Sequence, residues 1–164
     1  MKGNGIFVSD LNQRIADFLA QRRIAVAGLS TKRQITGNLI YRKLKGAGYE
    51  LVPIMPAGGE FEGDQSYPDL MAVPGKLDGI FIATRPEVTT TLVQQAVDVG
   101  VPRIWMHESL VKAASSVSQE GVMLAQQHGI ALIAGSCPMM HVQPVDFAHR
   151  CMCWLMKVTK RMPA

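Results

Sequence analysis

Residues that could bind a phosphate group follow an apolar run near the start of the chain. The run from Ile24 to Ala27 ends at Gly28, and Leu29-Ser30-Thr31-Lys32-Arg33 follows, so a glycine precedes hydroxyl groups and two cations. An apolar run of this kind is typical of a parallel strand buried on both faces. Gly28 permits a tight turn, after which backbone amides and the start of the next helix can point at an anion. The stretch therefore predicts a nucleotide-phosphate loop.

The glycine spacing in this loop differs from the two common nucleotide signatures. A dinucleotide fingerprint requires G-x-G-x-x-G and an ATP loop requires G-x-x-x-x-G-K-[ST], but the glycine after Gly28 is Gly37. The second apolar run ends at Ile54-Met55-Pro56-Ala57, without the carboxylate that usually binds the ribose of NAD. No Lys-Ser or Lys-Thr pair follows the loop, which argues against ATP hydrolysis. An NAD(P)-binding oxidoreductase subunit remains an alternative.

Alternating strand and helix patterns surround the loop. We expect strands at 24–27, 49–55, 79–83, 103–106 and 130–134. We expect helices after an N-cap pair at Ser9-Asp10, over 36–46, from a capping box at Thr84-Arg85-Pro86-Glu87 to Gly100, and over 116–128. The segment 56–76 reads as a loop with at most one short helical turn, and Pro53 indicates a position that needs no ladder donor.

This alternation predicts an α/β fold, a three-layer Rossmann-like domain whose five-stranded parallel sheet is flanked by helices. Residues 1–164 would form a single domain with a core at about 20–140, an N-terminal helix and a C-terminal helix at about 144–161. Ligands of such sheets bind at the carboxyl ends of the strands where the strand order reverses. The loops that begin at Gly28, Thr84 and His107 should therefore surround the site.

Composition narrows the class of ligand. The chain has 164 residues, 48% of them hydrophobic, and 17 Lys and Arg against 13 Asp and Glu give a net charge of +4. This charge favours a polyanionic ligand, but the cations are too dispersed for nucleic acid. No apolar run is long enough to cross a membrane and no signal sequence is visible, so we expect a cytoplasmic protein. An odd number of cysteines, three, predicts reduced thiols.

Five motifs in series resemble one family. They are Gly28-Leu29-Ser30, the strand 49–56, Tyr67-Pro68-Asp69-Leu70, Thr84-Arg85-Pro86-Glu87 and Gly135-Ser136-Cys137-Pro138. In this order they resemble the small CoA-binding domain proteins, which are stand-alone relatives of the N-terminal CoA-binding domain of the succinyl-CoA synthetase alpha subunit. The resemblance covers residues 20–140, and its specificity lies in the series because each motif alone is weak.

The resemblance implies that coenzyme A or an acyl-CoA is the ligand. The loop 28–33 would hold the CoA phosphates, the end of the second strand would pack on adenine, and the turn 84–86 would border the pantetheine arm. Lys32 and Arg33 would supply charge-assisted bonds to the pyrophosphate or the 3′-phosphate, and which of them meets the 3′-phosphate stays open. The cofactor-binding residues that we expect are Gly28, Leu29, Ser30, Lys32, Arg33, Asn38, Met55, Pro56, Thr84, Arg85, Pro86 and His107.

Two departures from the synthetase limit what is carried over. The synthetase has a lysine just beyond the second strand, where this chain has Ala57-Gly58-Gly59, and its phosphorylated histidine lies in a further domain. We therefore expect a ligand-sensing or carrier module, with no catalytic residues and no ligase activity. Neither a serine elbow nor a recognisable Cys-His pair indicates an enzyme. One hypothesis is that Cys137 exchanges with the CoA thiol.

The C-terminal segment supports a third reading. Its cysteines and histidines match no standard zinc spacing, so we expect no metal site. A helix over 144–156, with Val145, Ala148, Met152 and Leu155 on an apolar stripe, favours core packing or a dimer surface. A partner-binding module with a vestigial nucleotide site, docking a protein or a second copy through this helix, is therefore a further alternative. Earlier in the chain, Arg85 opposes the dipole of the helix it begins, so a ligand anion or a carboxylate partner would explain it.

Overall fold

Strands and helices alternate along most of the chain. The computed structural model describes residues 4–109 and 115–159. Its elements in chain order are α1 (Asn4–Leu19), β1 (Arg23–Ala27), α2 (Thr36–Gly46), β2 (Glu50–Ile54), β3 (Gly59–Phe61), β4 (Asp64–Ser66), β5 (Gly79–Ile82), α3 (Pro86–Val99), β6 (Arg103–Met106), α4 (Gln119–Gln127), β7 (Ala131–Ala134), the 3-10 turn η2 (Pro138–Met140) and α5 (Phe147–Val158).

Five parallel strands form the central sheet, in the order β2-β1-β5-β6-β7. The chain moves outward from β1 to the edge strand β2 and then returns to place β5 on the other side of β1. The order therefore reverses between β1 and β5, whose carboxyl ends lie side by side. The predicted α/β fold with a five-stranded parallel sheet is confirmed.

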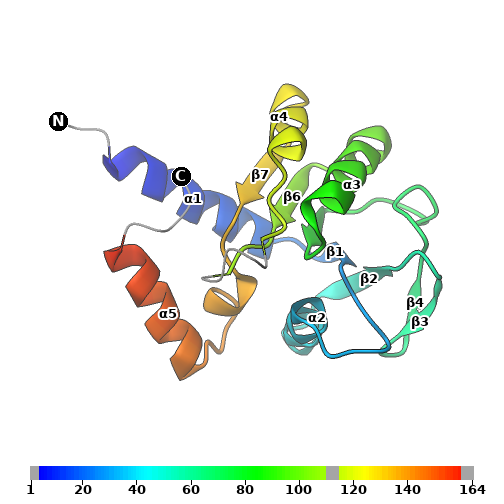
Figure 1. Ribbon diagram of the computed structural model, residues 1–164, viewed down its shortest axis with the longest axis horizontal. Coiled ribbons are helices and arrows are strands. Elements are labelled where there is room, and N and C mark those ends of the chain that lie inside the picture. Colours follow the sequence, from blue (N-terminus) through cyan, green and yellow to red (C-terminus); the bar gives the residue numbers. More distant parts are fainter. Residues whose placement is uncertain (1–3, 110–114, 160–164) are drawn as a thin grey trace.

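Helices cover both faces of this sheet (Figure 1). Successive strand residues point to opposite faces, so Ile24 and Val26 join the apolar cluster beneath α1, α2 and α5. Ala25 and Ala27 join the second cluster, beneath α3 and α4. Both clusters draw on nearly every strand, which explains why the strands read as continuous apolar runs.

The proline in β2 lies at the outer edge of the sheet. Its carbonyl oxygen accepts a hydrogen bond of 3.0 Å from the Tyr67 amide, on the side away from β1. Within a strand the N–H and C=O groups of one residue point the same way, so the donor that Pro53 lacks would also face away from β1. The β1 ladder loses nothing, as the sequence indicated.

The predicted loop over 56–76 is wrong in its first half. Strands β3 and β4 form an antiparallel hairpin, and their turn is Glu62-Gly63, both with positive φ. Two such residues make the tight turn that suits the twist of a hairpin. No helical turn occurs in this segment. Figure 1 shows the hairpin beyond the β2 edge and beside α2.

Two predicted N-caps are also wrong. Ser9 and Asp10 lie inside α1, where the Asp10 carboxylate pairs with Arg14 one turn later and so supports the helix interior. In α3 the N-cap is Arg85, with no side-chain capping bond, because the Thr84 hydroxyl instead lies 3.0 Å from that of Thr89. Pro86 does occupy the first turn, as predicted.

The last helix is shorter than predicted and turned about its axis. It begins at Phe147 after the N-cap Asp146 and ends at Val158, and residues 160–161 of the prediction lie outside the described part. The predicted stripe is wrong, because Ala148 and Leu155 are exposed. The residues that meet the core are Met152, Cys153 and the buried Met156. No helix within the described ranges is long and apolar enough to span a membrane.

Candidate functional site

The loop after β1 lies at the point where the strand order reverses. Gly28 has a φ of 92°, and a Cβ atom there would overlap the carbonyl group of Ala83 at the end of β5. A Cβ on Gly37, in the first turn of α2, would overlap the carbonyl oxygen of Gly28. Only glycine fits at either position, so the two glycines hold the loop, the end of β5 and the start of α2 together.

Asn38 sets the shape of this loop from within. Its side chain is 3% exposed; Oδ1 accepts from the Ser30 amide at 3.0 Å, while Nδ2 donates to the carbonyl oxygens of Ser30 at 2.7 Å and Arg33 at 3.0 Å. Ser30 Oγ accepts from the amides of Lys32 and Arg33, each at 3.2 Å. These three amides are therefore engaged inside the loop, contrary to the expectation that they point at a phosphate. Asn38 positions the loop, and the side chains beyond it face outward.

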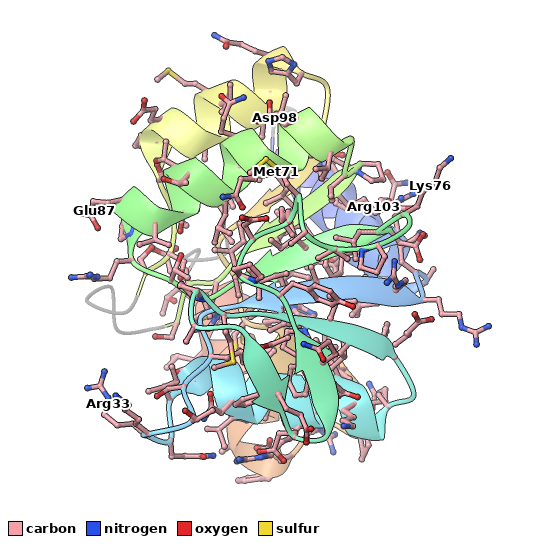
Figure 2. The ribbon with its side chains drawn as sticks, turned by 90° about the vertical axis from the view of Figure 1, so that its right-hand side faces the viewer. Arg33, Met71, Lys76, Glu87, Asp98 and Arg103 are labelled. Atoms are coloured by element: carbon pink, nitrogen blue, oxygen red, sulfur yellow. The ribbon has the colours of Figure 1, made fainter. Side chains whose placement is uncertain are left out.

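Unpaired cations gather around this loop. Lys32, Arg33 and Arg85 are exposed, and no described residue forms an ion pair with any of them. Figure 2 shows Arg33 projecting from one edge of the molecule, on the side of Glu87 at the start of α3, with Lys76 and Arg103 at the opposite edge. The carboxylate partner considered for Arg85 is thus not found among the described residues, so this cation is open to an anionic ligand.

Helix α2 adds a favourable end. Its N-cap is Ile35, which has no side-chain capping bond, and its first turn carries no acidic residue. The positive end of the helix dipole therefore faces the loop without a resident negative charge.

Of the two residues at the end of β2 that we expected to pack on adenine, only one is exposed. Met55 is 9% exposed and belongs to the apolar cluster that includes Tyr41 and Phe61. Pro56 is exposed. In this structure Pro56 alone of the pair presents a surface on which a purine could pack.

His107, the last of the predicted site residues, is buried at the end of β6. It is 2% exposed, and neither ring nitrogen has a hydrogen-bonding partner among the described residues. Burial lowers the pKa of this imidazole to about 4, and the nearby Ser136 backbone offsets the shift only in part, since the contact falls short of a hydrogen bond. The ring is therefore neutral and enclosed, and the backbone carbonyl of His107 accepts from the Ser116 amide at 2.7 Å.

A pocket of about 340 Å³ lies between the phosphate loop and the hairpin. Sequence reasoning found Ser30, Lys32, Arg33 and Asn38 on its wall but missed Gln34, just beyond the loop, and the lining residues of α2 and the hairpin, Arg42 and 60–62. The Glu62-Gly63 pair between short alternating segments was the signal that could have revealed the hairpin. Which helix residue faces the hairpin could not be read from the chain.

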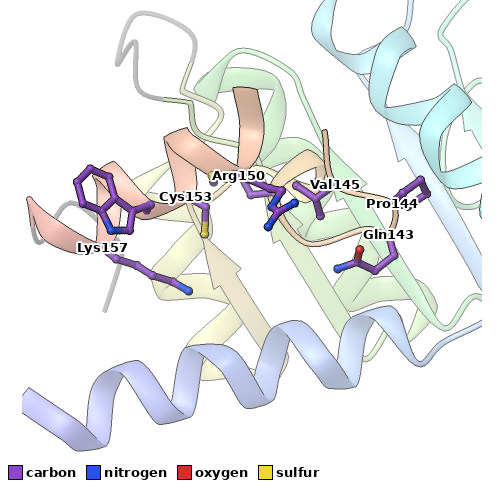
Figure 3. Close-up of a pocket in the computed structure, with 8 residues that line it drawn as sticks. Gln143, Pro144, Val145, Arg150, Cys153 and Lys157 are labelled. Carbon is purple, nitrogen blue, oxygen red and sulfur yellow. The ribbon is translucent and has the colours of Figure 1, made fainter. Parts of the chain in front are cut away.

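A larger pocket, of about 640 Å³, lies away from the loop, under α5 (Figure 3). Its walls come from 143–145 and from the α5 residues Arg150, Cys153, Trp154 and Lys157.

The three cysteines are free thiols, as predicted. Cys137 is buried, and burial raises its pKa to about 11, which argues against the thiol-exchange hypothesis because little thiolate forms near neutrality. No set of three or more metal-ligating side chains meets within the described ranges.

Comparison with known protein families finds a match that contains the loop at the strand-order reversal. A family model described as CoA binding domain matches residues 22–143, which span all five strands of the sheet and the loop at Gly28. The chain belongs to the CoA-binding domain family. The resemblance seen in the sequence is thereby confirmed, and the positions at which we expect cofactor-binding residues lie within the matched range.

Relatives of this CoA-binding domain include proteins without a described activity. The uncharacterized protein YneT of Bacillus subtilis (strain 168) is 25% identical over 116 residues, which cover 71% of this chain and 82% of YneT. A hypothetical protein from Pyrococcus horikoshii OT3 has a similar structure, with a TM-score of 0.70, 23% identity and coverage of 84% of this chain and 93% of that one.

A larger enzyme also contains this fold. The dinucleotide-forming acetyl-coenzyme A synthetase 1 of Ca. Korarchaeum cryptofilum matches with a TM-score of 0.61 and 24% identity, over 72% of this chain but only 26% of its own. The similarity extends to the fold of about a quarter of that enzyme.

Proposed function

We propose that the protein binds coenzyme A or an acyl-CoA at the carboxyl ends of β1 and β5, as a ligand-sensing or carrier module without catalysis of its own. The observation that carries this proposal is the set of unpaired cations, Lys32, Arg33 and Arg85, around a glycine-anchored loop at the strand-order reversal. Membership of the CoA-binding domain family supports the choice of nucleotide.

Charge and shape favour CoA over the alternatives. CoA carries a pyrophosphate and a phosphomonoester, which suit several separate cations better than the single pyrophosphate of NAD does. The end of β2 presents no carboxylate for the ribose of NAD, because Ile54 is followed by Met55 and Pro56. The Cys137 thiol, which could have exchanged with the CoA thiol, is buried with a raised pKa and is therefore not an activated nucleophile.

The direct test is ligand binding by protein stripped of bound nucleotide. Thermal shift and calorimetric titration would compare CoA, acetyl-CoA, dephospho-CoA, NAD, NADP and ATP, because a ligand that binds the native state raises its melting temperature with occupancy. We expect stabilisation by the CoA compounds only. Stabilisation by NAD or NADP would instead support the oxidoreductase alternative, and none by any nucleotide would contradict the proposal.

Matched variants locate the site. Arg33→Ala should weaken CoA binding by about tenfold, as loss of a charge-assisted phosphate contact does. Lys76→Ala is the control, since Lys76 is exposed at the opposite edge of the molecule (Figure 2). Equal losses in the two variants would show that only net charge matters and would refute the placement.

A second candidate function is a docking module built on α5. Phe147, Trp154, Leu155 and Val158 are 81%, 65%, 45% and 60% exposed, and their spacing of 7, 8 and 11 residues from Phe147 puts them on one side of the helix. Such a stripe is typical of an interface. Sedimentation over a concentration series would show assembly that Trp154→Arg abolishes; a monomer at every concentration would leave a second copy without support.

A further inference from the structure

The second wall of the loop pocket carries an arginine that is already occupied. Arg42 Nη2 and Nε both donate to Glu62 Oε1, at 2.5 and 3.0 Å, and Nη1 donates to Gln34 Oε1 at 2.9 Å. The guanidinium is thus held by Gln34, which directly follows the phosphate loop, and by one residue of the hairpin turn. All three residues line the pocket that also contains Lys32 and Arg33.

Glu62 is an unusual residue for its position. It has a φ of 51° in the hairpin turn, a conformation that asparagine and glycine adopt readily and glutamate rarely does. Helix α2 fixes it there, because Lys45 Nζ donates to the Glu62 carbonyl at 2.5 Å while the Glu62 carboxylate reaches Arg42. Unfavourable backbone that persists under such contacts points to a use for the side chain.

The Arg42–Glu62 ion pair is weak enough for a stronger anion to replace Glu62. The side chains are 45% and 36% exposed, and both guanidinium bonds end on a single carboxylate oxygen rather than forming a parallel two-oxygen fork. Exposed ion pairs of this kind are weak. A phosphomonoester, with its nearly two negative charges and three acceptor oxygens, is a stronger partner for arginine.

The pocket has the charge and the shape for such an end group. Its wall holds three cations, Lys32, Arg33 and Arg42, against two carboxylates, Glu60 and Glu62. Displacing Glu62 from Arg42 would direct the third cation into the pocket. Hairpin residues 60–62 line the pocket together with the loop, so a terminal phosphate would lie between the loop and the hairpin.

We propose that Arg42 exchanges Glu62 for a terminal phosphomonoester of the ligand, so that Glu62 acts as an internal competitor that sets the affinity of this subsite. The inference rests on the proposed function, in which that group is the 3′-phosphate of CoA. The affinity for a ligand without this group, such as dephospho-CoA, should depend on neither Arg42 nor Glu62.

The test compares CoA with dephospho-CoA in a double-mutant cycle measured by calorimetry. Glu62→Gln should tighten CoA by about three- to tenfold, because the neutral amide competes less for Arg42. Arg42→Gln should weaken CoA by about tenfold or more, and each variant should change dephospho-CoA by less than about twofold. In the Arg42→Gln background the Glu62→Gln effect should vanish, since Glu62 acts through Arg42.

Controls separate this subsite from stability and from general charge. Glu50→Gln removes the same charge from a comparable pair, Arg23–Glu50 at 2.9 Å, which lies at the amino ends of β1 and β2. This variant should change the affinity for neither ligand. If Arg42→Gln does not fold, Arg42→Lys keeps the charge without the fork and should still lose most of the preference for CoA.

The outcomes distinguish the two proposals. A wild-type protein that binds CoA, with a CoA to dephospho-CoA ratio unchanged in all variants, would overturn the role of Glu62 and leave CoA binding intact. A wild-type protein that binds neither compound would overturn both.

Discussion

Single residues decide whether the phosphate loop can form. The loop touches Ala83 and Gly37 through backbone atoms, and Asn38 uses its whole amide to hold Ser30 and Arg33. A residue larger than glycine at position 28 therefore meets main chain, which cannot move aside as a side chain can. The cations that face outward depend on this scaffold for their positions.

Gly28→Ala should reveal this dependence. We expect it to lower the free energy of unfolding by about 3 kcal/mol or more, because it adds a clash with Ala83 to a strained φ. Gly48→Ala is the matched control: Gly48 has the same φ of 92° but no atom within 4 Å of the added Cβ, so about 1 kcal/mol is expected. Urea denaturation would measure both. Equal costs would mean that conformation, not the contact with β5, restricts position 28.

At the scale of elements, α2 connects the phosphate loop with the hairpin. Its first turn packs against Gly28, and three residues further along it, Tyr41, Arg42 and Lys45, contact β3–β4. The buried Tyr41 hydroxyl donates to the Asp64 carboxylate, which also lies 2.7 Å from Lys45 Nζ. Burial raises the pKa of Tyr41 and the Asp64 hydrogen bond raises it further, so this phenol remains a donor at any ordinary pH.

Tyr41→Phe should loosen the hairpin without unfolding the sheet. The lost hydrogen bond should cost about 1–2 kcal/mol and speed amide hydrogen exchange over residues 59–66. Tyr49→Phe removes the hydroxyl of a half-buried tyrosine, which donates to the Leu19 carbonyl at 2.6 Å, and should leave exchange in the hairpin unchanged. Unaltered hairpin exchange in Tyr41→Phe would show that Lys45 alone holds Asp64 in place.

At the scale of the whole molecule, the buried imidazole of His107 and the half-buried imidazole of His141 make stability depend on pH. Burial lowers the pKa of His107 and of His141 to about 4, and the positive charge of Lys157 adds to the effect on His141. The unfolded chain, with an imidazole pKa of 6.5, binds these protons first. The free energy of unfolding is therefore undiminished by these two histidines above pH 6.5, and it decreases as the pH falls towards 4.

The decline should be measurable by urea denaturation at a series of pH values. His107 accounts for up to about 3 kcal/mol by pH 4, and the less buried His141 for less. His107→Phe should remove the larger share of the slope between pH 6.5 and 4, whereas His128→Gln, which removes an exposed imidazole, should not. A slope that survives in His107→Phe would assign the pH dependence to other groups.

The sequence by itself determined the parallel sheet and the phosphate loop. The five strands are apolar at nearly every position because both sheet faces are covered, and such runs are visible without any knowledge of the partners that cover them. Gly28 and its following cations were likewise visible, because a strand, a glycine and a helix start are contiguous in the chain. The family could be recognised for the same reason, since its motifs are local and lie in a fixed order.

Only the tertiary structure decided which polar groups are free and which are engaged. The side chains of Ser30 and Asn38 accept hydrogen bonds from loop amides that, from the sequence, we expected to bind a phosphate. Met55 is buried in the core beside Tyr41. The Arg42–Glu62 pair joins residues 20 positions apart, on a helix and on a turn. Such pairings depend on how α2 rotates against the hairpin, and side-chain packing sets this rotation. The exposed stripe of α5 has the same origin, because the pattern of the helix contains two apolar sides and only packing determines which one meets the core.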